Sequence, residues 1–503
     1  MKSPAHNPRG MTLVEMLVAT TCTLILMGAI AQVFGAFGTA VSDSRSMIEL
    51  DAQLRSVAWR LRNDLSGATA RTLPPLEVEA GEGYFEVIEG PRVDVDGGVD
   101  RTSLAPADID DVLLFTTRNT ETPYLGRYTS NPAAPGTTQT NESQLAEVAW
   151  FLRPTEPSTG TSPPVTTYTL FRRQNLVIGY VGFKPFYDRA DGSKGANQVD
   201  WVTFNSWAKF FDQFDLSTQL QTARAPDGTI TSQNIFPNSL ADLTRRENRF
   251  MHNGAGTIDA ASGKYRFPDG TVLGKSNYHW QLTPAPDGLV FDTRNSVINS
   301  DGLTLALANN STRVGEDVVL TNVIGFDVRV FDPGAPVGVS VGGDSAVVPG
   351  DGGFAAATIA GNGAYVDLGW NKGPYGVVAT SGQRPRFANL AEPMSGLRSA
   401  AGPAIWDTWS THYESNGFDD DNDGVADEGA DGLDNDSDGK VDESPYDVDG
   451  DGLFTGAGDD PGELETLPPY RFPLRGIEIR LRCYEPSSRQ VRQVTIRHSF
   501  VPR

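Results

Sequence analysis

The sequence predicts an α+β protein in which one long N-terminal helix precedes a β-rich antiparallel head. An apolar run over 11–41 and a three- and four-residue spacing of apolar side chains beyond it predict the helix. Short alternating segments separated by turns predict the head after Gly67, in a chain with 53 glycines and 33 prolines. With 503 residues, the chain is far longer than one average domain.

Residues 11–41 are long enough to cross a bilayer, since they exceed the roughly 20 apolar residues that a spanning helix needs. Glu15 is their only side chain that is charged at neutral pH. A carboxylate inside such a segment costs on the order of 2.5–3.5 kcal/mol, so it should face a partner rather than lipid. Cleavage after Gly10 would supply that partner, because Met11 would then carry a free α-amine at the head of the helix.

The stretch from Arg9 to Val18, with its basic leader, glycine, apolar run and single carboxylate, resembles the type IV prepilin signal. The resemblance implies a leader over 1–10, cleavage after Gly10 by prepilin peptidase and N-methylation of Met11. Glu15 would then pair with the amine of a neighbouring subunit. Two alternatives remain. One is a secretory signal cleaved before Gln32, after the small-x-small tripeptide over 29–31. The other is a plain signal anchor over 1–41.

The expected helix becomes amphipathic after the membrane segment and ends near Gly67, so that it covers 11–67. A helix from Met11 to Ser66 would be about 80 Å long at 1.5 Å per residue. One apolar stripe along its second half would rest on the head. The stripe consists of Met47, Leu50, Leu54, Val57, Leu61 and Leu65.

Residues 68–503 are expected to form the head, with its strands antiparallel and half-buried. The predicted strands cover 111–116, 147–152, 167–173, 323–331, 476–484 and 491–500. Residues 185–315 read as an insertion with a charged, solvated helix near 239–250. The glycine-rich stretch 334–363 is predicted to be a loop.

The order of these strands resembles that of J-type minor pseudopilins of type II secretion and PilW-like minor pilins. The shared features are an L-F-R-R strand ending at Arg173, a later V-x-x-F-x-V strand and a closing alternating strand. Members of that family are usually shorter, which implies large loop insertions here. The absence of proline from the expected helix, between Met11 and Pro74, fits a minor rather than a major subunit.

This resemblance implies a single-pass protein of the bacterial inner membrane with a periplasmic head that joins a pilus-like filament. The subunit would help to initiate or cap a type II secretion pseudopilus or a type IV pilus. Its partners would be other minor and major pilin or pseudopilin subunits, prepilin peptidase, the inner membrane and an exported substrate. The alternative is a calcium-stabilised surface adhesin held by an ordinary signal anchor.

The net charge of −23 is concentrated in one segment, because residues 417–465 hold 19 acidic residues and one lysine. No basic patch of the kind that binds nucleic acid is evident. The pattern D-x-D-x-D-G starts at Asp419, Asp434 and Asp447. This spacing gathers three side-chain oxygens around a point, and glycine allows the next carbonyl to turn inward, as in the first half of an EF-hand calcium loop.

The second half departs from an EF-hand, since the twelfth positions are Ala430, Pro445 and Gly458. The pattern is closer to thrombospondin type 3 repeats, and that resemblance implies a calcium-binding insertion over 417–462. The alternative is a disordered acidic linker. The resemblance implies one ion at Asp419, Asp421, Asp423, Asp427 and the Val425 carbonyl, and a second at Asp434, Asp436, Asp438, Asp442 and the Lys440 carbonyl. A third copy would use Asp447, Asp449 and Asp451.

No enzyme is expected. The five histidines show no zinc-type spacing, and the chain lacks a G-x-S-x-G elbow and a phosphate-binding glycine-rich loop. Cys22 lies in the membrane segment and Cys483 in a predicted strand, so we expect neither a nucleophile nor a structural disulfide.

Overall fold

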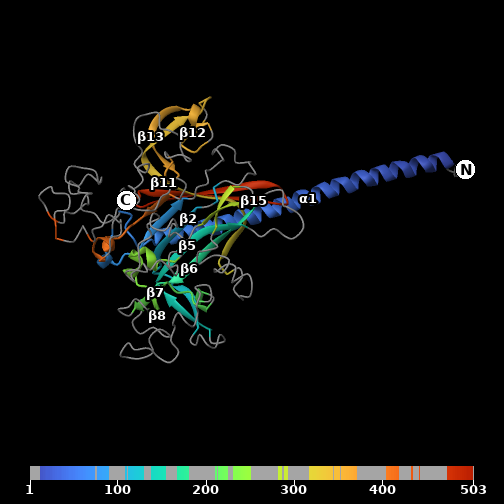
Figure 1. The fold of residues 1–503 in the computed structure, drawn as a ribbon. Helices are drawn as coiled ribbons and strands as arrows, with labels where there is room; N and C mark the ends of the chain where they lie inside the picture. The colour runs from blue at the N-terminus through green and yellow to red at the C-terminus, as the bar shows by residue number, and fades with distance from the viewer. Residues whose placement is uncertain are drawn as a thin grey trace, which may run out of the picture.

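A long helix leads into a β-rich head in the computed structural model (Figure 1), which confirms the predicted α+β class. The structure describes residues 12–73, 76–89, 108–109, 111–129, 138–154, 167–179, 210–211, 213–224, 230–250, 281–285, 288–292, 316–343, 345–351, 353–370, 404–417, 427, 432–433, 441 and 473–501.

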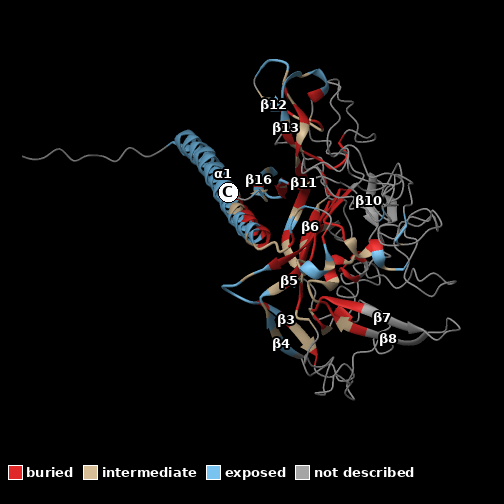
Figure 2. Ribbon diagram, turned by 90° about the vertical axis from the view of Figure 1, so that its left-hand side faces the viewer, coloured by how far each residue is buried: buried red, intermediate tan, exposed pale blue. Residues whose placement is uncertain are grey.

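The helix α1 covers Leu13–Ser66 and changes its environment half-way along. Its first half is exposed on every described side, whereas burial begins at Met47 where the helix reaches the head (Figure 2). The predicted apolar stripe is the buried one, from Met47 to Leu65. Gly67 ends the helix as expected. A larger residue does not fit at this position, because its Cβ atom would collide with the Arg118 carbonyl and the Thr117 hydroxyl.

The head is built on a ten-stranded sheet whose described strand pairs are all antiparallel. Its main path runs β14-β1-β2-β5-β6-β11-β15-β16, and β12 and β13 pair with the far half of β11. All six predicted strands are confirmed and are consecutive in this path. The strands are β1 (Phe85–Glu89), β2 (Val112–Arg118), β5 (Leu145–Pro154), β6 (Tyr168–Leu176), β11 (Val318–Val339), β12 (Ala346–Val347), β13 (Thr358–Val366), β14 (Ala404–Asp407), β15 (Gly476–Glu485) and β16 (Gln490–Ser499).

Smaller elements surround this sheet. Three two-stranded sheets pair β3 (Tyr124–Thr129) with β4 (Thr138–Ser143), β7 (Thr218–Arg224) with β8 (Ile230–Pro237), and β9 (Gln281–Ala285) with β10 (Gly288–Asp292). Short 3₁₀ turns lie at Val78–Ala80, Asp242–Thr244, Arg246–Asn248, Phe354–Ala356 and Thr411–Ser415.

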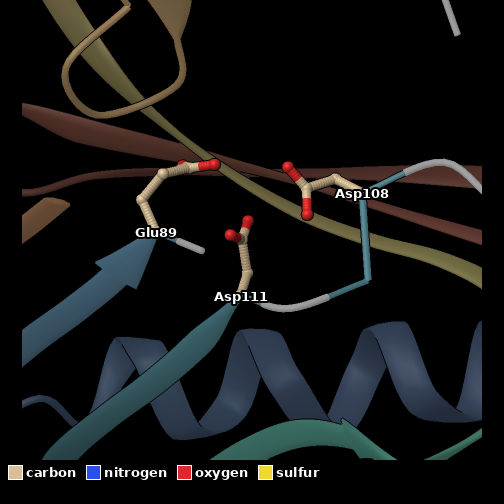
Figure 3. Close-up of side chains that lie close together, drawn as sticks. All are labelled: Glu89, Asp108 and Asp111. Atoms are coloured by element: carbon tan, nitrogen blue, oxygen red, sulfur yellow. The ribbon is translucent and has the colours of Figure 1, made fainter. Parts of the chain in front are cut away.

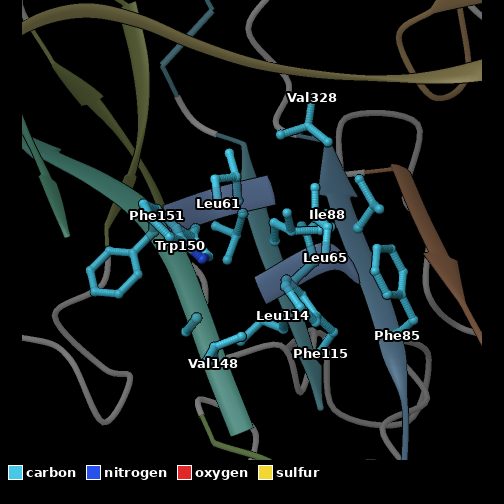
Figure 4. Close-up of a cluster of buried hydrophobic side chains, with 14 of the residues drawn as sticks. Leu61, Leu65, Phe85, Ile88, Leu114, Phe115, Val148, Trp150, Phe151 and Val328 are labelled. Carbon is cyan, nitrogen blue, oxygen red and sulfur yellow. The ribbon is translucent and has the colours of Figure 1, made fainter. Parts of the chain in front are cut away.

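Both faces of the central strands are covered, so the expectation of half-buried strands is wrong there. Strand β2 is buried from Val112 to Thr117. The helix covers one face, where Leu61 and Leu65 lie against strands β1, β2 and β5 (Figure 4). Phenylalanines of the predicted insertion, including Phe211 and Phe250, are buried in the same core. The insertion therefore covers the second face of the sheet, and its described part belongs to the core.

The helix is fixed to its face of the sheet by a buried ion pair. The Arg172 guanidinium donates to both carboxylate oxygens of Asp64, with both N–O distances at 2.7 Å. Trp150 adds a hydrogen bond from its indole Nε1 at 3.1 Å, and the Thr117 hydroxyl donates to the Asp64 carbonyl at 2.8 Å. Because all four residues are buried, this joint fixes the C-terminal end of the helix in the head.

The neighbouring Arg173 points to the opposite face, as strand alternation requires. Its guanidinium lies 2.8 Å from Asp215 and 3.2 Å from Asp317, and it also donates to the Phe214 carbonyl. Two adjacent arginines of β6 therefore hold the helix on one side and the insertion on the other.

The expectation of a charged, solvated helix near 239–250 is wrong. The segment forms two short 3₁₀ turns, and Arg246 and Arg249 are buried against Glu86 and Asp407. The four N–O distances of this cluster lie between 2.6 and 3.2 Å. The arginines in this segment led to the prediction of a solvated helix because their acidic partners are not nearby in the sequence. Those partners come from β1 and β14, more than 150 residues away along the chain.

The glycine-rich stretch 334–363 is also not the predicted loop. The end of β11 pairs with β12 and β13 there and projects from the head (top of Figure 1). A small apolar cluster of Ala335, Ala364, Val366 and Trp370 supports this projection.

Breaking the Arg172–Asp64 pair should destabilise the head strongly. In Arg172→Met the Asp64 carboxylate stays buried without its cation, so we expect the free energy of unfolding to fall by roughly 3–5 kcal/mol. Chemical denaturation of the full chain in detergent micelles, followed by tryptophan fluorescence, measures this. The matched control is Arg71→Met, whose partner is Glu82 and whose side chain is 65% exposed; about 0–1 kcal/mol is expected there. Equal losses in the two variants would contradict the assigned role of the joint.

A buried cluster of Asp327, Arg329 and Arg480 makes the stability of the head depend on pH. Burial raises the pKa of Asp327 to about 6, although Arg329 lies 3.0 Å away and Arg480 3.8 Å away. The unfolded carboxyl titrates near pH 3.9, so between about pH 4 and 6 the folded chain holds the extra proton. We therefore expect the stability of the wild type to fall through this window, relative to Asp327→Asn, as pH rises. Denaturation curves at pH 4 and 7 test the sign, and parallel profiles for the two proteins would refute it.

Candidate functional site

The first turn of α1 is closed by a capping box between Thr12 and Glu15. The Glu15 N–H donates to the Thr12 hydroxyl oxygen at 3.2 Å. In return, the Thr12 N–H and hydroxyl donate to Glu15 Oε2 at 2.8 and 2.9 Å. Each side chain thereby satisfies a backbone donor that a helix start leaves without an intrahelical acceptor.

The sequence argument identified Glu15 but missed Thr12 as its partner. The signal was present, because Thr12-Leu13-Val14-Glu15 has the S/T-x-x-E spacing of a capping box. Gly10 and Met11, the predicted processing residues, lie outside the described residues. The structure therefore shows how Glu15 is held within one chain and leaves its predicted pairing with a Met11 amine as a prediction.

The helix that carries Glu15 has the length and composition of a membrane span. Its most apolar 18-residue window has a mean hydropathy of 2.0, and none of that window is buried inside the protein. Large apolar side chains such as Leu24, Ile25 and Phe34 are exposed on all sides of this half. A helix that is apolar all round and has no protein cover needs lipid or other helices around it.

Residues 6–31 match the family model described as the prokaryotic N-terminal methylation motif. The chain carries a prepilin-type N-terminus. Together with the apolar helix, this supports a type IV pilin-like protein that is processed by a peptidase and anchored by a single span. Comparison with curated proteins and with solved structures gave no match. The family match thus covers the first part of the membrane half of α1 and does not reach the head.

Of the predicted calcium ligands, the structure describes Asp427. Its Oδ1 accepts a hydrogen bond from the Gly417 N–H at 2.7 Å, and its backbone is left-handed, with φ at 60°. This hydrogen bond ties the Asp427 side chain to Gly417, the last described residue before the acidic segment. The other predicted ligands lie outside the described residues: Asp419, Asp421, Asp423, Val425, Asp434, Asp436, Asp438, Lys440, Asp442, Asp447, Asp449 and Asp451.

A second group of carboxylates, which the sequence argument missed, lies inside the head. Glu89 ends β1, Asp111 precedes β2 and Asp108 lies just before it, so that the three side chains converge (Figure 3). One carboxylate oxygen from each lies within 4.8 Å of the other two, and all three residues are buried. Asp111 accepts a hydrogen bond from the Val328 N–H at 2.6 Å, and Glu89 one from the Leu368 N–H at 3.3 Å.

Oxygen ligands of this kind suit hard cations such as calcium. The antiparallel register of β1 and β2 explains why Glu89 meets Asp111, because Ile88 is opposite Val112. A sequence reading could have placed these two together only after pairing the strands. Asp108 comes from a connection that no strand pattern marks, so its convergence with the others had no sequence signal.

Proposed function

We propose that this protein is a minor pilin or pseudopilin subunit whose helix assembles into a filament and whose head stands on the periplasmic side. The observation that carries the proposal is the prepilin-type N-terminus on a helix that is apolar all round. The helix is also fixed to a large head by the Asp64–Arg172 joint. Such a subunit transmits any movement of its membrane helix directly to its head.

Glu15 would gain a second partner during assembly. Within one chain both Thr12 donors use a single oxygen, Oε2, and a carboxylate can accept further donors at its other oxygen. The α-amine of Met11 on a neighbouring subunit fits that position. In the low dielectric of a packed helical core, the pair would fix the axial register of adjacent helices.

The minor role, in initiation or capping, rests on the size of the head and on the helix itself. Between Leu13 and Ser66 the helix has no proline, and the head carries an insertion whose described part packs against one face of the sheet. Such bulk is easier to accommodate at a filament tip than along its length. The head would then contact other subunits or an exported substrate.

The decisive experiment identifies the N-terminal residue of the mature protein by mass spectrometry. We expect N-methylated Met11 in the wild type and no processing in Gly10→Val. Glu15→Gln should be processed normally but assemble at least tenfold less, because the neighbouring amine loses its counter-charge. Thr20→Ala is the matched control, since that hydroxyl bonds only to carbonyls of its own helix in the described structure. A mature N-terminus at Gln32, or an intact Met1, would refute the proposal in favour of a secreted or anchored adhesin.

We also propose that calcium orders residues 417–462. The support is the repeated aspartate spacing, whose oxygen donors match the ligands of calcium, together with the hydrogen bond from the Gly417 N–H to the Asp427 carboxylate. Without a cation, 19 acidic side chains in 417–465 would repel one another.

Calcium titration of the full chain in detergent micelles tests this second proposal. We expect calcium-dependent heat and protection of 417–462 from proteolysis, both lost in Asp423→Asn with Asp438→Asn. A matched pair of substitutions, Asp459→Asn with Asp460→Asn, lies outside the predicted ligands and should retain both. Absence of calcium-dependent heat in the wild type would exclude the assignment.

A further inference from the structure

A pocket opens on the head beside the C-terminal end of α1. Its volume is about 760 Å³, which lies within the usual range of ligand sites. Arg118 lines it, and the Arg118 N–H donates to the Gly67 carbonyl at 2.7 Å. The membrane half is at the other end of this helix, about 80 Å long at 1.5 Å per residue. We therefore call it the distal pocket, bounded by Arg118, Asn141, Leu145, Ile178 and Leu240.

The walls of the distal pocket are tied to one another by hydrogen bonds. The Val177 N–H donates to the Leu145 carbonyl at 3.0 Å, and the Ser143 hydroxyl donates to the Val177 carbonyl at 2.7 Å. The Gly179 N–H donates to the Asn238 carbonyl at 3.1 Å. A ligand would therefore meet a preformed pocket, and little entropy would be lost in ordering it.

The lining of the distal pocket combines apolar side chains with polar groups that the described protein leaves unbonded. Val177 is buried, and Leu145, Ile178 and Leu240 are half-buried beside it. A guanidinium and a carboxylate on the same pocket do not pair with each other, so a ligand that carries both charges would complement them. Five lining side chains form no hydrogen bond or ion pair with any described residue: Arg118, Thr120, Asn141, Glu142 and Gln144.

The edge of β4 borders the distal pocket. Asn141, Glu142 and Ser143 follow one another on this strand, and all three line the pocket. Successive side chains of a strand point to opposite faces, so this continuous run places the edge of the strand, rather than one face, at the pocket. In the described sheets β4 pairs with β3 and has no strand on its other side. Backbone groups on that side are open to a further strand.

These features match a peptide better than a nucleic acid. The side-chain amides of Asn141 and Gln144 each present donors and an acceptor, as a peptide backbone does. A single-stranded nucleic acid would need aromatic platforms along a basic groove. Among the described residues, the pocket is lined by one arginine and by no aromatic side chain.

We propose that the distal pocket binds an extended peptide that adds to the free edge of β4. The peptide carries an acidic side chain toward Arg118 and a basic one toward Glu142, and an apolar side chain between them packs on Ile178 and Leu240. Its backbone pairs with β4, which is recognition by strand addition. This site goes beyond the proposed function, because it belongs to the head alone and does not depend on filament assembly.

Titration calorimetry on the full chain in detergent micelles tests the site. The probe is a pentapeptide with blocked ends, in which glycines flank lysine, leucine and aspartate. The reversed sequence is tested beside it, because a strand can add in either direction. We expect one of the two to bind. Arg118→Gln and Glu142→Gln should each weaken that binding about tenfold, through the loss of a charge-assisted hydrogen bond.

Changes in the probe identify which contact each variant removes. Replacing the aspartate of the probe by asparagine should cancel the effect of Arg118→Gln and leave that of Glu142→Gln. Alternate N–H groups of a strand face its neighbour. N-methylation at the leucine or at the aspartate, tested separately, should therefore weaken binding at one position and spare it at the other.

Two substitutions remove exposed charges outside the pocket and serve as matched controls, Arg489→Gln and Glu49→Gln. Both should retain wild-type affinity, and every variant should keep the wild-type unfolding midpoint. Absence of heat with both peptide directions would overturn the inference. So would equal losses in the controls, or binding that neither N-methylation changes. None of these outcomes bears on Met11 processing, so the proposed function is tested separately.

Discussion

The geometry of the whole protein depends on the buried ion pair between Asp64 and Arg172. The pair sits where the helix ends, and its two N–O distances of 2.7 Å hold that end of α1 on the sheet, along which the buried stripe of the helix lies. A buried pair adds little net stability compared with apolar packing. Losing one member is costly, however, because the other is left as a buried charge without a counter-charge or water around it. The Trp150 indole on β5 donates a hydrogen bond to the same carboxylate and so restricts its orientation further.

The helix has to satisfy two environments that a single residue pattern cannot serve. Its first half is exposed and apolar on all sides, and its second half buries one stripe on the head. Glu15 is the charged exception in the first half, and the capping box keeps its carboxylate hydrogen-bonded within one chain. The Glu15 carboxylate thus has hydrogen-bond donors within its own chain, and its pairing with the amine of a neighbouring subunit stays a prediction.

Local patterns were sufficient to predict the helix, its stripe and six strands, because each depends on residue periodicity within a short window. The end of the helix at Gly67 was also predictable, since glycine follows the last buried turn. The two-sided burial of β2 was not, because the cover comes from residues 210–250, far along the chain. For the same reason Arg246 and Arg249 were predicted to be solvated, whereas acidic partners on β1 and β14 bury them. In the candidate site, spacing identified Glu15, but the convergence of Glu89, Asp108 and Asp111 requires the folded sheet.

Successive side chains of β6 point to opposite faces of the sheet, so that the helix and the insertion are held on different faces. Arg172 faces the helix and Arg173 faces the insertion, so one strand holds both layers through adjacent residues. The helix therefore lies on one side of the sheet, and the described part of the insertion lies on the other. A large, specialised head is in this way compatible with an N-terminal helix that keeps the general requirements of a pilin-type filament.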